Sequence, residues 1–174
     1  GAWELAGLFT STRMPMTSLY RPPRVRMLDG CLRRARERFG ARLVPADAGG
    51  VRMLYRALRR GEAVGVLPDQ DPGQDGGIFA PFFGVPAKTS TLTARLVAGS
   101  DAMAVLGWGE RLEGGRGYRM RYVELDGVVF RCGDIERATC ALNLELERAI
   151  RQFPQQYMWS YRRFRHRPPG HRNP

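Results

Sequence analysis

Asp69 and Asp71 flank Gln70 directly after the apolar run from Ala63 to Leu67. If that run is a buried strand, the three polar residues stand at the carboxyl edge of a sheet, where α/β proteins usually bind their ligands. The spacing of the two carboxylates could suit a metal ion, but without a histidine they form a weak ligand set. The pattern Asp-x-Asp-Pro-Gly is also common in turns. The residues alone leave a binding turn and an ordinary turn open, and they imply no metal.

Arg21 and Arg95 are candidates for binding an acidic group. Pro22 holds Arg21 extended, so a strand that ends there would present the guanidinium to the same edge of the sheet. Arg95 follows Leu92 by three residues, at the border of a predicted apolar helix face, where a cation needs a partner. Each also has an ordinary interpretation, because either side chain could simply be solvated.

The spacing of apolar residues predicts the elements that would position these side chains. Apolar residues three or four apart indicate amphipathic helices, and continuous apolar runs suit strands covered on both faces. The predicted helices cover residues 25–39, 51–58 and 135–153. The predicted strands cover residues 43–44, 63–67, 103–108 and, half-exposed near an edge, 118–122. This order predicts an α/β fold with a mixed, mostly parallel sheet flanked by helices.

The composition indicates one basic domain over residues 1–174. Lys and Arg total 28 against 17 acidic residues, a net charge of +11, and every basic residue except Lys88 is arginine. Guanidinium binds phosphate through two parallel hydrogen bonds, although a codon bias would explain the arginine count equally well. Three cysteines without C-x-x-C spacing indicate neither a disulfide scaffold nor a zinc site, and they fit a reducing environment. The sequence has no apolar run of the roughly 18 residues that a membrane span needs.

Three groups of residues occur in a fixed order along the chain. They are Gly-Ala-Trp-Glu at 1–4, Pro-Asp-Gln-Asp-Pro-Gly at 68–73 with Gly-Ile-Phe-Ala-Pro-Phe-Phe-Gly at 77–84, and Gln-Tyr-Met-Trp-Ser-Tyr-Arg-Arg-Phe at 156–164 with Arg-Pro-Pro-Gly at 167–170. Together they make the chain resemble the late acyltransferases of lipid A biosynthesis over nearly its whole length. The resemblance implies a fold like that of the lysophospholipid acyltransferases.

Glu4 is the catalytic residue that the resemblance implies. The family carries a motif H-x-G-N/A-W-E/D, and Gly1 to Glu4 match its last four positions, so its histidine would lie two residues before Gly1. Such a histidine takes the proton of an attacking hydroxyl, and a carboxylate behind the ring fixes its tautomer. We therefore expect a chain without its N-terminal anchor and first active-site strand, inactive by itself. The ordinary alternative is an acid in the first turn of a helix.

The resemblance also implies substrate-binding residues. They are Arg21, for a phosphate, then Asp69, Gln70 and Asp71, for the acceptor or the architecture of the site, with Arg111. Arg95 stays a secondary candidate because of its position on the predicted helix. Ile78 to Phe83 form either core or one wall of an acyl-chain channel. The family's proline-bearing A-P-V-V-P-V run is Ala-Met-Ala-Val-Leu-Gly at 102–107 here, so the sequence does not predict acyl-chain length.

The resemblance implies transfer of a fatty acyl group from acyl carrier protein to a hydroxyl, or hydroxyacyl chain, of a lipid A precursor, with no cofactor. Relatives that acylate phosphatidylinositol mannosides or lysophospholipids share much of the pattern. A nucleic-acid-binding module is an alternative of another class, suggested by the charge and by tyrosines among arginines at 118–122 and 157–164. A third possibility is an inactive remnant of a decayed gene.

The end of the chain, from Arg162 to Pro174, is rich in Arg and Pro and has no acidic residue. We expect an exposed, partly ordered tail there that rests on anionic lipid headgroups at the cytoplasmic face of the cell inner membrane. His166 and His171 lie in this segment, and we expect neither to reach a site beside Glu4.

Overall fold

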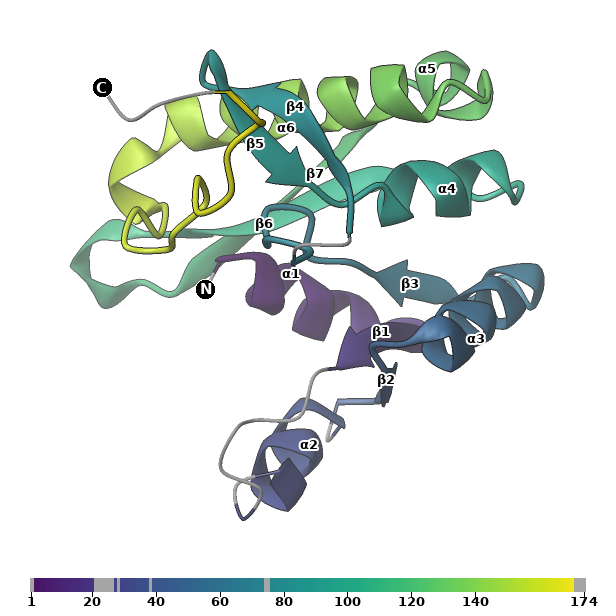
Figure 1. The fold of residues 1–174 in the computed structure, drawn as a ribbon. Coiled ribbons are helices and arrows are strands. Elements are labelled where there is room, and N and C mark those ends of the chain that lie inside the picture. The colour runs from purple at the N-terminus through teal and green to yellow at the C-terminus, as the bar shows by residue number, and fades with distance from the viewer. Residues whose placement is uncertain (1, 21–26, 28, 38, 74–75, 171–174) are drawn as a thin grey trace.

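The computed structural model describes residues 2–20, 27, 29–37, 39–73 and 76–170 (Figure 1). Three strands form a parallel sheet, and two antiparallel hairpins lie beyond it. The elements are α1 Ala2–Ser11, β1 Met16–Tyr20, α2 Asp29–Glu37, β2 Ala41–Pro45, α3 Ala48–Arg59, β3 Ala63–Gly65, β4 Ile78–Phe82, β5 Val85–Thr89, α4 Leu92–Ala98, β6 Val105–Arg111, η2 Glu113–Gly115, β7 Tyr118–Glu124, α5 Gly127–Arg131, α6 Ile135–Gln152 and η3 Pro154–Gln156. The α/β class is confirmed, and the parallel and antiparallel strands lie in separate sheets and not in one mixed sheet.

The parallel sheet has the order β2-β1-β3, and α3 packs against it. Asp47 caps α3 by accepting the N–H of Gly50 at 2.8 Å, and Leu54 and Ala57 of the helix are fully buried. Gly50 is required by a close approach, because a Cβ there would lie 1.7 Å from the carbonyl oxygen of Pro45. The predicted helix at 51–58 and the strands at 43–44 and 63–67 are thus present, with ends shifted by a few residues.

The two hairpins, β4–β5 and β6–β7, are antiparallel. The run at 103–108 was expected in the parallel sheet, but its strand begins at Val105 and pairs with β7. The run is apolar for the predicted reason, since both faces of β6 are covered. Leu106 and Trp108 are buried in the core, whereas Gly107 and Gly109 lie against α1. A continuous apolar run indicates that both faces of a strand are covered, but it does not indicate whether the strand pairs in parallel or antiparallel.

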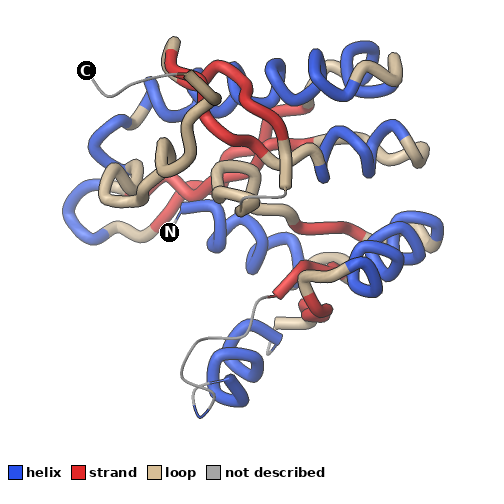
Figure 2. The backbone as a smooth tube through the Cα atoms, viewed as in Figure 1, coloured by secondary structure: helices blue, strands red, loops and turns tan. Residues whose placement is uncertain are grey.

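The larger core cluster lies between α6 and both hairpins, and it contains Phe82, Trp108, Phe130, Leu142 and Leu146. Figure 2 shows α6 running alongside the hairpins as the longest helix, and the predicted helix at 135–153 is confirmed. A smaller cluster joins Val44, Leu54 and Leu96 under α3 and α4.

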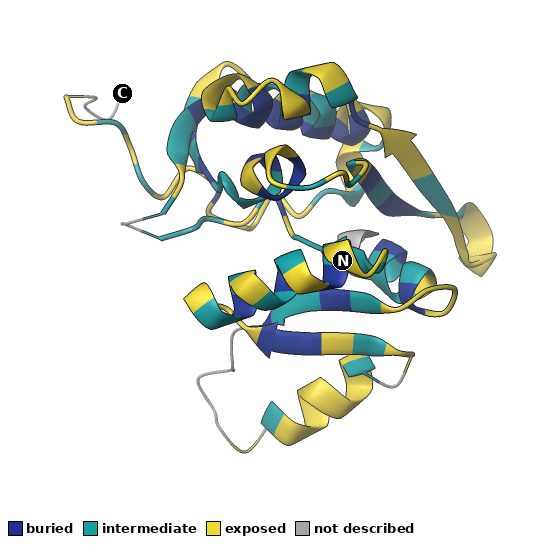
Figure 3. Cartoon of the chain, turned by 90° about the vertical axis from the view of Figure 1, so that its right-hand side faces the viewer, coloured by how far each residue is buried: buried dark blue, intermediate teal, exposed yellow. Residues whose placement is uncertain are grey.

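The predicted helix at 25–39 is shorter than expected and uncovered. It begins at Asp29 as α2, and residues 21–26, 28 and 38 lie outside the described part of the chain. No residue of α2 is buried, although its apolar spacing predicts an inward face, and Figure 3 shows the helix exposed at the edge of the molecule.

α1 lies directly on β6 because two glycines of that strand have no side chains to hold it off. A Cβ on Gly109 would lie 3.2 Å from Cβ of Leu5, and a Cβ on Gly107 would lie 3.3 Å from Cβ of Ala6. The hydroxyl of Tyr122 on β7 donates to the carbonyl of Ala6 at 3.1 Å. The two chain segments run in opposite directions, so the first turn of α1 points toward the end of β6.

Candidate active site

The turn Pro68–Gly73, here called the acidic turn, follows β3 at the carboxyl edge of the parallel sheet, as the sequence predicts. Oδ1 of Asp71 accepts the backbone N–H of Gly73 at 2.8 Å, which closes the turn. Asp69 and Asp71 are half-buried, whereas Gln70 between them is exposed. The two carboxylates therefore face the protein, and the amide faces water.

The segment Gln156–His166, here called the C-terminal segment, lies against the acidic turn. The backbone N–H of Asp71 donates to the hydroxyl of Tyr161 at 2.7 Å. Nε2 of His166 lies 3.3 Å from Oδ2 of Asp71, an oxygen that is buried. The expectation of an exposed tail from Arg162 onward is therefore wrong for Arg163, which is buried, and for His166, which is half-buried, whereas Arg162, Phe164 and Arg165 are exposed. His166 contacts a predicted binding residue, whereas His171 lies outside the described residues.

Arg163 anchors the C-terminal segment and is only 3% exposed. Its guanidinium donates to the carbonyl of Lys88 at 2.6 Å and to the hydroxyl of Thr89 at 2.7 Å, and it lies over the ring of Phe82 at 5.1 Å from the centroid. Burial lowers the pKa of Arg163, and the anionic groups nearby, including Asp69, oppose that shift. The charge is held by carbonyl and hydroxyl dipoles and by an aromatic face.

Tyr157 lies between Arg163 and the acidic turn. Burial raises the pKa of its phenol, the charge of Asp69 raises it further, and Arg163 opposes the rise. The phenol consequently stays neutral through the physiological range and keeps a proton that it can donate.

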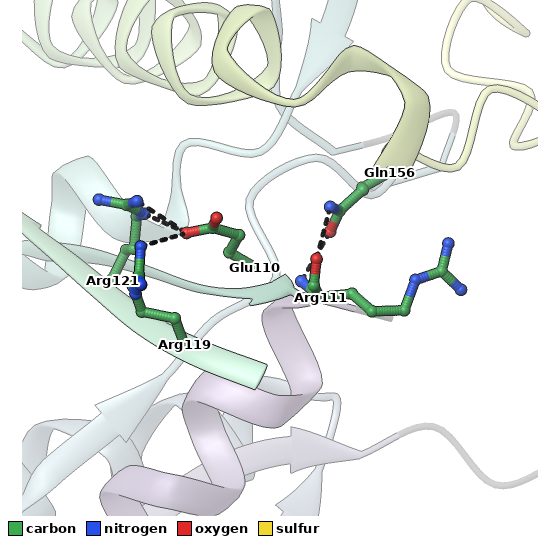
Figure 4. A network of polar contacts seen from close by, with 5 residues as sticks. All are labelled: Glu110, Arg111, Arg119, Arg121 and Gln156. Carbon is green, nitrogen blue, oxygen red and sulfur yellow. Dashed lines mark hydrogen bonds and ion pairs between the residues drawn. The ribbon is translucent and has the colours of Figure 1, made fainter. Parts of the chain in front are cut away.

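Arg111 is the last residue of β6, and it contacts Gln156, the first residue of the C-terminal segment (Figure 4). Its backbone N–H donates to Oε1 of Gln156 at 2.8 Å, and Nε2 of Gln156 donates to its carbonyl at 3.0 Å. The side chain of Arg111 is exposed and points away from this pair of bonds. It borders an open hollow of about 550 Å³ that Tyr118 and Gln155 also line. An open polar hollow of this kind could admit a headgroup but does not enclose a ligand.

The arginines of β7 form ion pairs with Glu110 of β6, the other strand of their hairpin. Arg121 donates from Nε to Oε2 of Glu110 at 2.7 Å, and Arg119 lies 3.8 Å from the same oxygen (Figure 4). Glu110 is 12% exposed, so the carboxylate draws both cations onto the hairpin. Glu110 thus pairs with both arginines of the pattern at 118–122, although Arg119 stays 59% exposed.

Glu4 lies in the first turn of α1, next to Leu5, and thus toward the end of β6 that carries Arg111. The side chain of Glu4 lies outside the described part of the structure, as does Arg21, which follows the last residue of β1, Tyr20. Arg95 is exposed on α4, and its carbonyl accepts the hydroxyl of Tyr55 at 2.8 Å. Its exposure fits the solvated interpretation, and its role in binding stays a prediction.

The sequence model of the bacterial lipid A biosynthesis acyltransferases matches residues 1–166, which include Glu4, the acidic turn and the C-terminal segment. The chain belongs to this family. It is 32% identical over 169 residues to the lipid A biosynthesis palmitoleoyltransferase of Escherichia coli (strain K12), covering 96% of this chain and 54% of the relative. It is 31% identical over 172 residues to the lipid A biosynthesis lauroyltransferase of the same strain, covering 96% and 54%.

A lipid A biosynthesis acyltransferase of Haemophilus influenzae (strain ATCC 51907 / DSM 11121 / KW20 / Rd) is 30% identical over 171 residues, which is 97% of this chain and 52% of the relative. The chain thus spans about half the length of the curated relatives that it matches.

In this member of the lipid A acyltransferase family, the C-terminal segment joins three of the predicted residues. It contacts Asp71 directly, approaches Asp69 through Tyr157, and bonds to the backbone of Arg111. The motif at 156–164 supports the resemblance, but its sequence does not predict that its residues contact the acidic turn. The sequence contains the tyrosines and Arg163, but the residues around them do not indicate that they contact a turn about ninety residues earlier.

Two further findings concern the described residues. They contain no cluster of three or more His, Cys, Asp or Glu side chains that could hold a metal ion. In the same part of the chain, every helix is too short or too polar to cross a bilayer.

Proposed function

We propose that the protein carrying this chain transfers a fatty acyl group from an acyl carrier protein thioester to a hydroxyl of a lipid A precursor. The observation that carries the proposal is the family match over residues 1–166, which spans both Glu4 and the acidic turn. The similar proteins are lipid A acyltransferases, and one of them is a lauroyltransferase.

In the proposed reaction, the acceptor oxygen attacks the thioester carbonyl carbon, the carbon–sulfur bond breaks, and an ester forms. A histidine expected upstream of Gly1 takes the hydroxyl proton and returns it to the leaving thiolate. Glu4 orients that ring and stabilises its positive charge. A general base of this kind typically contributes about 10² to 10⁴ in rate.

The acceptor is proposed to lie between the acidic turn and Arg111. Asp69 offers carboxylate oxygens and Gln70 an exposed amide for hydroxyls, Asp71 shapes the turn, and Arg111 and Arg21 offer guanidinium groups for phosphates. Such a division suits a phosphorylated sugar lipid better than a simple lysophospholipid, because the latter has a single phosphate and few hydroxyls.

The test is a transfer assay with the complete protein, acyl-loaded acyl carrier protein and three acceptors. We expect product with a phosphorylated lipid A precursor and at least tenfold less with a phosphatidylinositol mannoside or a lysophospholipid. A preference for either of the latter acceptors would show that the enzyme acylates that class of lipid instead. No transfer to any of them would refute the proposed function.

We also propose that the enzyme works at the cytoplasmic face of the inner membrane, with the C-terminal segment against anionic lipid. Met158 and Trp159 are each 57% exposed, and Arg162, Arg165 and Arg167 beside them are exposed as well. Tryptophan with arginine is typical of side chains at a lipid headgroup interface. Because Arg163 and His166 are engaged inside the protein, the neighbouring arginines are the ones left to meet the membrane.

Replacing Arg162, Arg165 and Arg167 together by glutamine should weaken binding to anionic vesicles about a hundredfold at low salt, since each arginine near such a surface contributes roughly 1 kcal/mol. Co-sedimentation with vesicles of anionic or neutral lipid measures this loss. The matched control replaces Arg131, Arg137 and Arg148, which are exposed on α5 and α6. Equal losses in the two triple variants would show that net charge, and not this surface, governs attachment.

A further inference from the structure

The C-terminal segment is held by a polar hub buried in the core. Asn143 of α6 is fully buried, and its Nδ2 donates to the carbonyl of Pro81 at 2.9 Å and to the hydroxyl of Thr89 at 3.0 Å. Arg163 donates to the same hydroxyl of Thr89 and approaches Oδ1 of Asn143 at 3.5 Å. α6, the β4–β5 hairpin and the C-terminal segment are therefore fastened at one point.

Two side chains on either side of this fastening point reach the acidic turn. Tyr161, two residues before Arg163, accepts the backbone N–H of Asp71, and His166, three residues after it, faces Oδ2 of the same aspartate. Oδ1 of Asp71 is already occupied by the N–H of Gly73. The main chain and one oxygen of Asp71 are thus set by residues about ninety positions later in the sequence.

Packing alone does not account for Tyr161. Tyr161 is 37% exposed, so packing covers only part of the residue, and its hydroxyl lies 2.7 Å from the Asp71 nitrogen. The side chain of Asp71 is only 10% exposed, and Nε2 of His166 lies 3.3 Å from its buried oxygen Oδ2. A buried carboxylate with one oxygen bonded can still rotate unless the second oxygen also has a partner.

We propose that Tyr161 and His166 are positioning residues that hold the acidic turn, through Asp71, in its acceptor-binding conformation, with Arg163 as their anchor. The inference rests on the proposed function for the role of the acidic turn, but the contacts that carry it do not. It assigns the C-terminal segment to the site itself and distinguishes these two side chains from the arginines that face the membrane.

The structural half of the proposal is tested without any activity, by amide hydrogen exchange on the complete protein. Tyr161→Phe removes the acceptor of the Asp71 N–H, so peptides that contain Asp71 and Gly73 should exchange at least fivefold faster. Tyr55→Phe is the control, because it deletes a hydroxyl that bonds to backbone elsewhere, at the carbonyl of Arg95. Unchanged exchange at the acidic turn in Tyr161→Phe would overturn the proposal.

The functional half is tested by kinetics. His166→Asn and Tyr161→Phe should each raise the KM for the acceptor about fivefold, with kcat and the melting temperature nearly unchanged. Tyr161→Phe loses a hydrogen bond and His166→Asn loses the imidazole contact with Oδ2 of Asp71, and both interactions position the acidic turn. A variant that only loosened the fold would instead lower the melting temperature and the amount of active enzyme together.

A double-mutant cycle pairs His166→Asn with Asp71→Asn. If His166 acts through Asp71, the double variant should have nearly the KM of Asp71→Asn alone; independent effects would multiply. Multiplying effects would overturn the assignment of His166. If wild-type enzyme shows no transfer, the proposed function fails, whereas faster exchange of the acidic turn in Tyr161→Phe would still support the structural half.

Discussion

Replacing Glu4 by glutamine in the complete enzyme should lower kcat by about 10² to 10⁴ while the KM for the acceptor changes little. The carboxylate is proposed to stabilise charge that develops on a histidine only as the reaction proceeds, so its loss is felt in the transition state. Glutamine has nearly the same shape and removes only the charge. Steady-state rates with acyl carrier protein thioesters measure the effect.

The control for this variant is its melting temperature, because an acid in the first turn of a helix also interacts with the helix dipole. That interaction contributes about 0.3 to 1 kcal/mol, which would shift the melting temperature by a few degrees and leave kcat of the folded enzyme intact. A small shift of the melting temperature with full kcat would show that Glu4 is only an acid in the first turn of a helix.

Replacing Gly109 by valine should lower kcat about a hundredfold although the residue is not expected to touch substrate. A Cβ at this position would already lie 3.0 Å from Cε of Met120 and 3.2 Å from Cβ of Leu5, and valine adds two further methyl groups. Leu5 adjoins Glu4, so the first turn of α1 must move away from β6. A displacement of about 1 Å at a catalytic group is enough for a loss of this size.

Gly30→Ala is the matched control, because a Cβ there meets nothing within 4 Å and alanine favours a helix. It should leave kcat unchanged and raise stability slightly. Gly109→Ala should fall between the two, since the flexible Met120 can yield but Leu5 can do so only by tenths of an ångström. Full activity in Gly109→Val, with a native circular dichroism spectrum, would show that α1 does not set the position of Glu4.

Local pattern was enough to predict α3, α6 and the site's acidic turn. α3 and α6 repeat apolar residues at helical spacing, and Asp69 and Asp71 follow a strand whose carboxyl end lies at the sheet's edge. In each case the information lies within some fifteen neighbouring residues, which is the range over which periodicity and turn chemistry act.

The C-terminal segment could not be predicted in the same way. Its arginines and prolines have the composition of an exposed tail, and Arg163 is buried only because Lys88, Thr89 and Phe82 form a cradle for it. Burial of a cation depends on partners that are distant in sequence. The pairing of β6 was missed for a similar reason, because coverage by α1 and α6 gives the same apolar run in either sheet direction.

The bond between Asp71 and Tyr161 joins residues ninety positions apart, and this separation orders the events of synthesis. A ribosome adds about 5 to 20 residues per second, so the nascent acidic turn waits roughly 5 to 20 s before its partner is even translated. During that interval the turn has neither the hydroxyl nor the imidazole that hold it. The site therefore matures only after the C-terminal segment has emerged, and a ribosome that stalls before the codon of Tyr161 releases a protein whose acidic turn lacks both.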